Sequence, residues 1–140
     1  MKKLMIVGAA MVFAAGAAFA GAHGSMSDQR VKAMKGVGGA MKAIGDGEGD
    51  AVQHAQTAKL LMGDMLKLFP EGSAEYRAKP NIWTDWDGFK AAMEKTDKAA
   101  AALLVAAEGG DRAKTLAALG DMGKTCKACH EEYRGPKPKE

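Results

Sequence analysis

The chain has 140 residues and a formal net charge of +3, with 47% hydrophobic, 26% charged and 6% aromatic residues. This length fits one domain, and the balance of apolar and charged residues is typical of a globular protein rather than a disordered one. Phosphate contacts need a dense basic patch, so the small charge gives no reason to expect a nucleic-acid partner. The composition argues against a multidomain enzyme and against a disulfide-rich miniprotein.

The first 20 residues have the three-part layout of a secretory signal peptide. Two lysines precede the uncharged apolar run 4–19, and Ala18-Phe19-Ala20 supplies small residues at the spacing of a signal-peptidase site. A retained membrane anchor is the alternative, but the run is shorter than the ~20 apolar residues that span a bilayer. We expect residues 1–20 to be removed on export. Residues 21–140 would then form one soluble periplasmic domain with no stable membrane insertion.

Two amphipathic helices are expected in the first half of the chain. From Ser27 onward, apolar residues recur at steps of three and four, the period of a helix: Val31, Met34, Val37, Met41 and Ile44. Ser27 or Asp28 can cap the start of this helix, and the glycine-rich run 45–50 ends it. A second helix is expected over about 50–68, before the breakers Pro70 and Gly72.

Two more helices are expected after an irregular stretch, 69–81. One spans about 82–107, and the other begins after Asp111 and ends before Gly135. The last helix carries one stripe of side chains: Leu116, Leu119, Met122, Cys126, Cys129 and Tyr133. No segment shows the alternating β-branched pattern of a strand. The sequence therefore predicts an all-α protein, an antiparallel four-helix bundle.

Both cysteines of the chain lie in one motif, Cys126-Lys127-Ala128-Cys129-His130, a pattern typical of c-type haem attachment. Positions i, i+3 and i+4 share one face of a helix, so the two thiols and the imidazole point the same way. The thiols can add to the two vinyl groups of a haem, and the imidazole can reach its iron. The motif predicts one covalent haem c, with its iron, near the C-terminal helix.

Three other kinds of site could use these cysteines. A thioredoxin-type redox pair normally follows a strand and begins a helix, whereas this motif lies near the end of a helical chain. A zinc site would need another ligand, and only His23 and His54 remain as nitrogen donors, without paired spacing. A plain structural disulfide is the third alternative. His54, inside the second expected helix, is interpreted as a surface or core histidine.

The chain resembles the class II c-type cytochromes, meaning cytochrome c prime and its six-coordinate, low-spin relatives. The strongest similarity is the segment 124–134 (KTCKACHEEYR), because class II proteins carry their haem motif at the C-terminus. Further similarities are 30–35 (RVKAMK), 38–42 (GGAMK), 68–72 (LFPEG) and 81–83 (NIW). The resemblance covers nearly all of residues 21–140 and implies an antiparallel four-helix bundle.

The resemblance also implies roles for individual residues. Cys126 and Cys129 would be the thioether sites, and His130 would be the proximal iron ligand. Arg134 matches a basic residue near the proximal face. Arg30 matches an arginine that pairs with a haem propionate through a charge-assisted contact.

Met34 decides between two functions. It matches the bulky residue that covers the distal face in cytochrome c prime, and also the axial methionine of the low-spin relatives. Ligation by its sulfur would make a six-coordinate electron carrier. If Met34 only fills the core, as methionine often does, the iron stays five-coordinate and open to a small gas. Val31 replaces a glutamine often found in cytochrome c prime, which favours ligation slightly, and Met41 is a weaker candidate ligand.

The main expectation is thus a periplasmic monohaem cytochrome that carries one electron, with iron bound by His130 and Met34. The alternative is a five-coordinate protein that binds nitric oxide or carbon monoxide. No acid/base pair and no Ser/His/Asp arrangement predicts an enzyme. The redox partners stay unknown, and a homodimer through the first two helices stays open.

Overall fold

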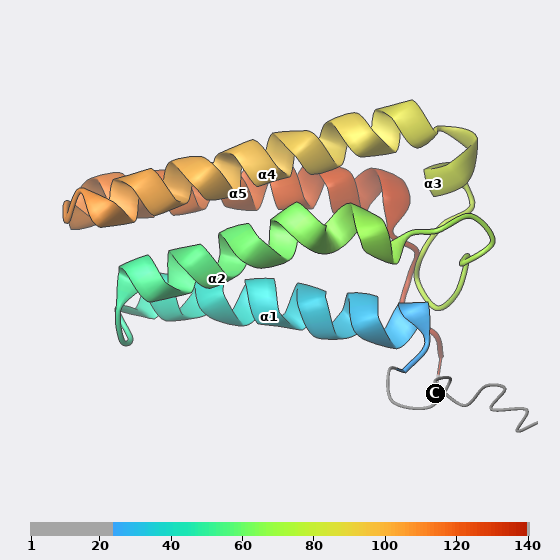
Figure 1. Ribbon diagram of the computed structural model, residues 1–140, viewed down its shortest axis with the longest axis horizontal. Coiled ribbons are helices and arrows are strands. Elements are labelled where there is room, and N and C mark those ends of the chain that lie inside the picture. The colour runs from blue at the N-terminus through green and yellow to red at the C-terminus, as the bar shows by residue number, and fades with distance from the viewer. Residues whose placement is uncertain (1–23, 140) are drawn as a thin grey trace, which may run out of the picture.

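Four long helices run antiparallel to one another in the computed structural model, which describes residues 24–139 (Figure 1). The elements are α1 (Met26–Asp46), α2 (Ala51–Asp64), the 3-10 helix η1 (Met65–Leu68), α3 (Asn81–Thr84), α4 (Trp86–Glu108) and α5 (Arg112–Tyr133). Residues 24–139 form no strand, only an isolated bridge between Ala78 and Arg134. The predicted all-α bundle is confirmed. The expected signal peptide, residues 1–20, lies outside the described residues, as does His23.

The helix starts follow from short polar side chains. Ser25 caps α1, because its Oγ accepts from the backbone N–H of Asp28 at 3.2 Å while the Asp28 carboxylate accepts from the Ser25 N–H at 3.1 Å. This reciprocal capping box satisfies two N–H groups that the helix itself leaves without partners. The prediction of Ser27 or Asp28 as the cap was wrong, since Asp28 occupies the third helical position. Asp111 caps α5 as predicted.

The expected third helix, 82–107, is broken in the structure. The backbone of Asp85 leaves the helical region at φ −123°, so α3 ends before it and α4 begins after it. The carboxylate of Asp85 then accepts from the backbone N–H of Gly88 at 3.3 Å and caps α4. Glycine at 88 leaves room for this cap, because a Cβ there would lie 2.3 Å from the Asp85 carboxylate and would push it aside. The second expected helix also divides, into α2 and the tighter η1.

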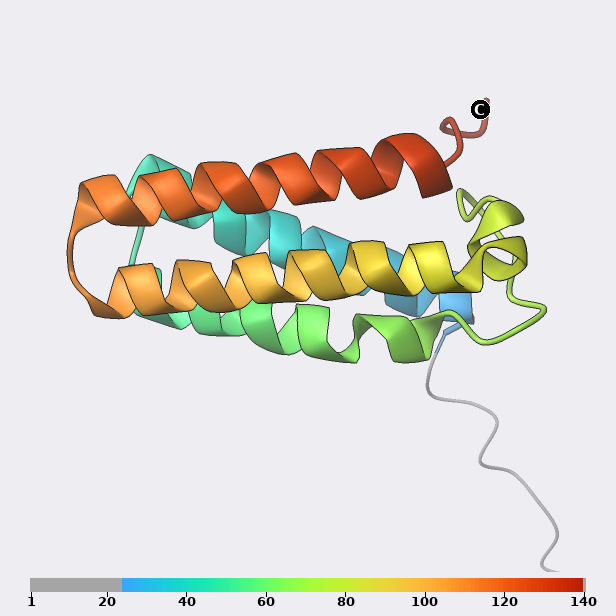
Figure 2. The same ribbon diagram turned by 90° about the horizontal axis from the view of Figure 1, so that it is seen from above.

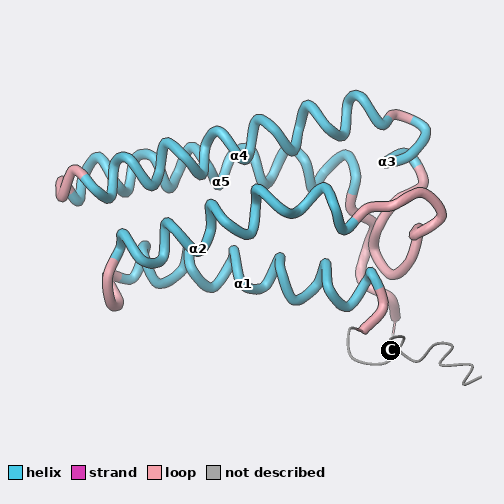
Figure 3. Tube along the Cα trace, viewed as in Figure 1, coloured by secondary structure: helices cyan, strands magenta, loops and turns pink. Residues whose placement is uncertain are grey.

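The longest loop of the described chain, residues 69–80, is tied to the end of α5 (Figure 3). Arg77 Nε donates to the carbonyl of Gly135 at 2.8 Å, and the Gly135 N–H donates to the Arg77 carbonyl at 2.7 Å. The N–H of Lys79 donates to the Tyr133 carbonyl at 3.1 Å. These bonds hold the loop and the C-terminal segment together at one end of the bundle.

The four helices do not close evenly around the core. α1 packs along α2, α2 along α4 and α4 along α5, whereas α1 and α5 contact each other far less (Figure 2). The buried core lies where packing is dense and includes Ile44, Ala55, Leu103 and Met122. The seam between α1 and α5 leaves room for a ligand at the end of the bundle that carries the haem-attachment motif. Among residues 24–139, none of the helices combines the length and the hydrophobicity that a membrane-spanning helix requires.

Candidate functional site

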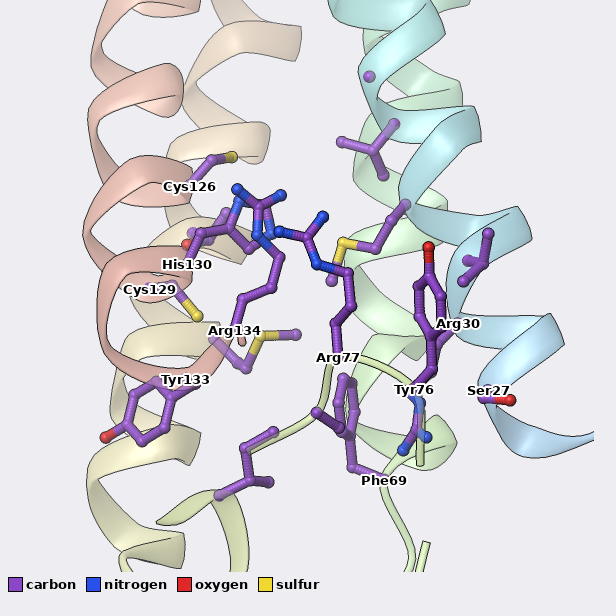
Figure 4. Close-up of a pocket in the computed structure, with 18 of the residues that line it drawn as sticks. Ser27, Arg30, Phe69, Tyr76, Arg77, Cys126, Cys129, His130, Tyr133 and Arg134 are labelled. Atoms are coloured by element: carbon purple, nitrogen blue, oxygen red, sulfur yellow. The ribbon is translucent and has the colours of Figure 1, made fainter. Parts of the chain in front are cut away.

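A cavity of about 630 Å³ lies along the seam between α1 and α5, at the end of the bundle that holds the loop 69–80 (Figure 4). This volume is in the range of sites for small molecules and cofactors. Nine large apolar side chains line it: Val31, Met34, Val37, Met41, Met62, Phe69, Ile82, Phe89 and Met93. The bundle therefore encloses an apolar site that opens to solvent near both termini of the described chain.

The α5 wall of the cavity carries the complete haem-attachment motif. Cys126, Cys129 and His130 all line the cavity, and Figure 4 shows them projecting from α5 toward it. Both cysteines are free thiols, and Cys129 is only 9% exposed. The helical spacing thus brings two thiols and one imidazole onto a single face, as the sequence predicted.

Burial shifts the pKa values of the two thiols and the imidazole of the motif. It raises the pKa of both thiols, that of Cys129 to about 11. A catalytic redox cysteine needs the opposite shift, because the thiolate is the attacking species. Burial lowers the pKa of His130, and the positive charges of Arg134 and Arg77 lower it further. A neutral imidazole is the form that binds a metal.

The structure favours neither of two alternatives for the motif. Among residues 24–139, no group of three or more His, Cys, Asp and Glu side chains is arranged to hold a metal ion. The elevated thiol pKa values give no support to a thioredoxin-type pair. His54 lies on α2 and does not line the cavity.

The α1 wall lies across the cavity from the motif. Met34 is half-buried and lines the same cavity as His130, and Met41 lines it farther along the helix. The cavity thus contains both His130 and Met34. Whether Met34 ligates the iron is the question that the sequence left open.

Arg30 lies at the edge of the cavity and holds the loop 69–80. It is 5% exposed, and its guanidinium donates to the Ser73 carbonyl at 2.8 Å and to Ser73 Oγ at 3.1 Å. Its cationic carbon also lies 4.9 Å from the centre of the Phe69 ring. No sequence pattern predicted this structural role of Arg30. Serine in a loop has no periodic pattern that would link it to an arginine 43 positions away.

An aromatic cluster supports the α5 wall. The ring of Phe89 lies 4.8 Å from Phe69 and 5.1 Å from Tyr133, both edge to face, an arrangement favoured by aromatic rings. The Tyr133 hydroxyl donates to the Asp85 carboxylate at 2.9 Å. This contact ties the end of α5 to the start of α4 and fixes the turn of helix that presents His130.

Arg77 is a site residue that sequence reasoning missed. It enters the cavity from the loop 69–80, and Figure 4 shows it with Arg134 beside His130. Both arginines also line a second cavity on the other side of His130, together with Lys127 and Glu131. Nothing in the sequence pairs the loop with the end of α5, so only the folded chain places Arg77 here.

Comparison with known proteins identifies the family. The family model described as "Cytochrome C'" matches residues 25–134. A cytochrome c′ from Rhodospirillum rubrum is 35% identical over 96% of this chain and 99% of its own length. A cytochrome c-556 from Agrobacterium tumefaciens is 32% identical over 81% of this chain and 97% of its own length.

A solved structure agrees with these relatives. It is the nitric oxide complex of a mutant of cytochrome c prime from Alcaligenes xylosoxidans, with a TM-score of 0.73 and 26% identity. The superposition covers 79% of this chain and 94% of that one. The chain therefore belongs to the cytochrome c′ family of proteins with covalently bound haem c.

Proposed function

We propose that this protein binds a small diatomic gas, nitric oxide or carbon monoxide, at the five-coordinate iron of a haem c in the cavity between α1 and α5. The observation that carries the proposal is the α1 wall, where Val31, Met34 and Val37 line the cavity opposite the α5 motif. Such a wall excludes water and suits a neutral ligand. The nitric oxide complex of a related cytochrome c prime supports the proposal.

The residues on the α5 wall fit the attachment of the haem. Cys126 and Cys129 offer two free thiols on one face, the chemistry that thioether links to two vinyl groups require. His130 offers a neutral imidazole for the iron. The haem, when bound, supplies the iron on which redox change and gas binding occur.

Three arginines lie where they could meet the carboxylates of the haem. Arg30, Arg77 and Arg134 all line the cavity. The donors of Arg30 are already shared with the loop through Ser73. From the resemblance to class II cytochromes we propose Arg30 as a propionate partner, a charge-assisted contact, in addition to its hold on the loop.

The electron-carrier interpretation remains the second candidate, because Met34 lines the same cavity as His130. Ligation by the Met34 sulfur would fill the sixth position of the iron and close it to gases. The two candidates differ in a single bond, so a substitution that removes only the sulfur separates them.

The test is the visible spectrum of the reduced, gas-free protein and of its Met34→Leu variant. Leucine has nearly the volume of methionine but no sulfur to ligate iron. We expect a broad, high-spin spectrum for both proteins, and Met41→Leu serves as the matched control. Sharp low-spin bands in the unaltered protein that disappear in Met34→Leu alone would overturn the gas-binding proposal and establish the electron carrier.

Export to the periplasm belongs to the same proposal. The segment 1–20 has a basic start, an apolar centre and small residues at its end, which supports a cleavable signal. N-terminal sequencing of the secreted protein tests this directly, and we expect it to begin at residue 21. A product that retains Met1 would contradict the cleavage.

A further inference from the structure

Four cations surround the opening of the cavity, and together we call them the cationic rim: Lys35, Arg77, Arg134 and Lys137. They come from α1, the loop 69–80 and the end of α5 with the segment after it. Lys35, Arg134 and Lys137 are exposed, and Arg77 is half-buried. Glu75 is the only carboxylate among the side chains that line this cavity.

The cationic rim has little internal neutralisation. None of its four members takes part in an ion pair within residues 24–139. Of the seven salt bridges among these residues, six join side chains one helical turn apart. Arg77 donates to a carbonyl, that of Gly135, rather than to a carboxylate. Even with two haem propionates and Glu75 present, the positive charges at the opening would outnumber the negative ones.

The opposite end of the bundle has the opposite charge. Its two turns, α1 to α2 and α4 to α5, lie together at the end far from the loop 69–80 (Figure 1). They carry five carboxylates: Asp46, Glu48, Asp50, Glu108 and Asp111. Three cations accompany these five carboxylates: Lys42, Arg112 and Lys114. Lys42 pairs with Asp46 and Lys114 with Asp111, whereas Arg112 donates to the carbonyls of Ile44 and Gly45.

This separation of charge matters more than the net charge of the chain, which is small. Charges of one sign around a cleft raise the rate at which oppositely charged partners arrive, by roughly 10- to 1,000-fold in strong cases. A long bundle that is positive at the cavity and negative at its far end would turn its cavity toward an anionic surface. The asymmetric charge thus indicates which face of the bundle docks and that the partner's surface is negatively charged.

We propose that the cationic rim is the docking surface for an acidic one-electron donor protein. One electron passes from the donor to the haem iron, which goes from ferric to ferrous, and no atom or proton is transferred. The donor is left oxidised by one electron. The proposal rests on the haem of the proposed function but not on gas binding, since a carrier and a gas-binding protein both need the reduced iron.

The test compares variants that remove equal charge at the two ends of the holoprotein. Lys35→Gln/Lys137→Gln neutralises two members of the cationic rim, and Lys42→Gln/Lys114→Gln neutralises two lysines near the acidic end. The probe is a flavodoxin, a small acidic one-electron donor. Stopped-flow absorbance gives the second-order rate of haem reduction, and calorimetry with the oxidised donor gives the affinity without electron transfer.

We expect the rim variant to lower the reduction rate about fivefold to tenfold at low salt and to weaken binding in parallel. The control variant should stay within about twofold, and the proteins should converge above about 0.1 M salt, where the Debye length falls below about 10 Å. Equal losses in both variants, or a rate that does not depend on salt, would overturn the proposal.

Two further measurements keep the outcomes separate. Binding of the holoprotein to anionic phospholipid vesicles, lost in the rim variant while flavodoxin binding is kept, would assign the surface to a membrane and contradict the proposal. Carbon monoxide titration of the same samples tests the proposed function. Failure to bind gas with an intact rim effect would contradict gas binding alone.

Discussion

The two walls of the cavity differ in how clearly their residues indicate a function. The α5 wall carries two thiols and an imidazole at a spacing that is typical of haem attachment. The α1 wall carries aliphatic and thioether side chains, which would look the same in any helical core. Haem attachment can therefore be predicted from reactive groups at a fixed spacing. Whether the iron takes a protein ligand or a gas depends instead on how the α1 side chains pack.

The largest effect is expected on the α5 wall. Replacing both cysteines, Cys126→Ala with Cys129→Ala, should abolish covalent haem, because no other thiol exists in the chain. Intact-mass spectrometry of denatured protein should show the mass of one haem in the unaltered chain and none in the variant. Met34→Leu is the control for the opposite wall and should keep the full increment. A haem mass in the double variant would refute the attachment sites.

A smaller but still substantial effect is expected at Arg30 on α1. Arg30→Ala removes a buried cation and leaves the Ser73 carbonyl without its donor. The free energy of unfolding of the holoprotein should fall by about 2–3 kcal/mol. Cleavage in the loop 69–80 should become faster in limited proteolysis. Lys32→Ala, an exposed neighbour on the same helix, should change the stability by less than about 0.5 kcal/mol.

The hydrogen bond between Tyr133 and Asp85 should give a modest effect with a distinctive pH dependence. Tyr133→Phe should lower stability by about 1 kcal/mol at neutral pH. Burial, with the Asp85 contact, raises the pKa of Tyr133 from 10 to about 12 in the folded protein. The folded state then holds its proton more tightly than the unfolded state. The stabilisation is complete below pH 10 and is lost as the pH rises toward 12.

Denaturant unfolding at several pH values checks this expectation. The difference in stability between the unaltered protein and Tyr133→Phe should shrink between pH 10 and pH 12. Tyr76→Phe is the matched control, because Tyr76 is 60% exposed and donates no hydrogen bond to a carboxylate in the described chain. A difference that stays constant over this range would show that Tyr133 titrates normally.

The smallest effect is expected for the ion pair between Lys59 and Asp97, which joins α2 to α4 away from the cavity. The Lys59 ammonium lies 2.8 Å from the Asp97 carboxylate, and both side chains are about one-third exposed. Solvent screening limits such a pair to about 0.5–1 kcal/mol. Lys59→Met should lower stability by that amount and leave the haem spectrum unchanged. A spectral change would mean that the α2–α4 contact shapes the cavity.

Periodicity predicted the four long helices because each buries one stripe of apolar side chains. The same rule missed the break at Asp85, since apolar residues continue on both sides of it and only the cap to Gly88 interrupts the helix. The three residues of the motif on α5 share one helix face, as their spacing predicts, and all of them line the cavity. Arg77 escaped prediction because its position depends on backbone bonds between a loop and Gly135, which local sequence does not reveal.

The most direct measurement of the account is the absorbance of the reduced protein before and after carbon monoxide is added. If Met34 covers the iron without ligating it, carbon monoxide should cause a saturable spectral change, with one gas molecule bound per haem. A low-spin spectrum that carbon monoxide leaves untouched would contradict the account and show that the α1 wall supplies a ligand.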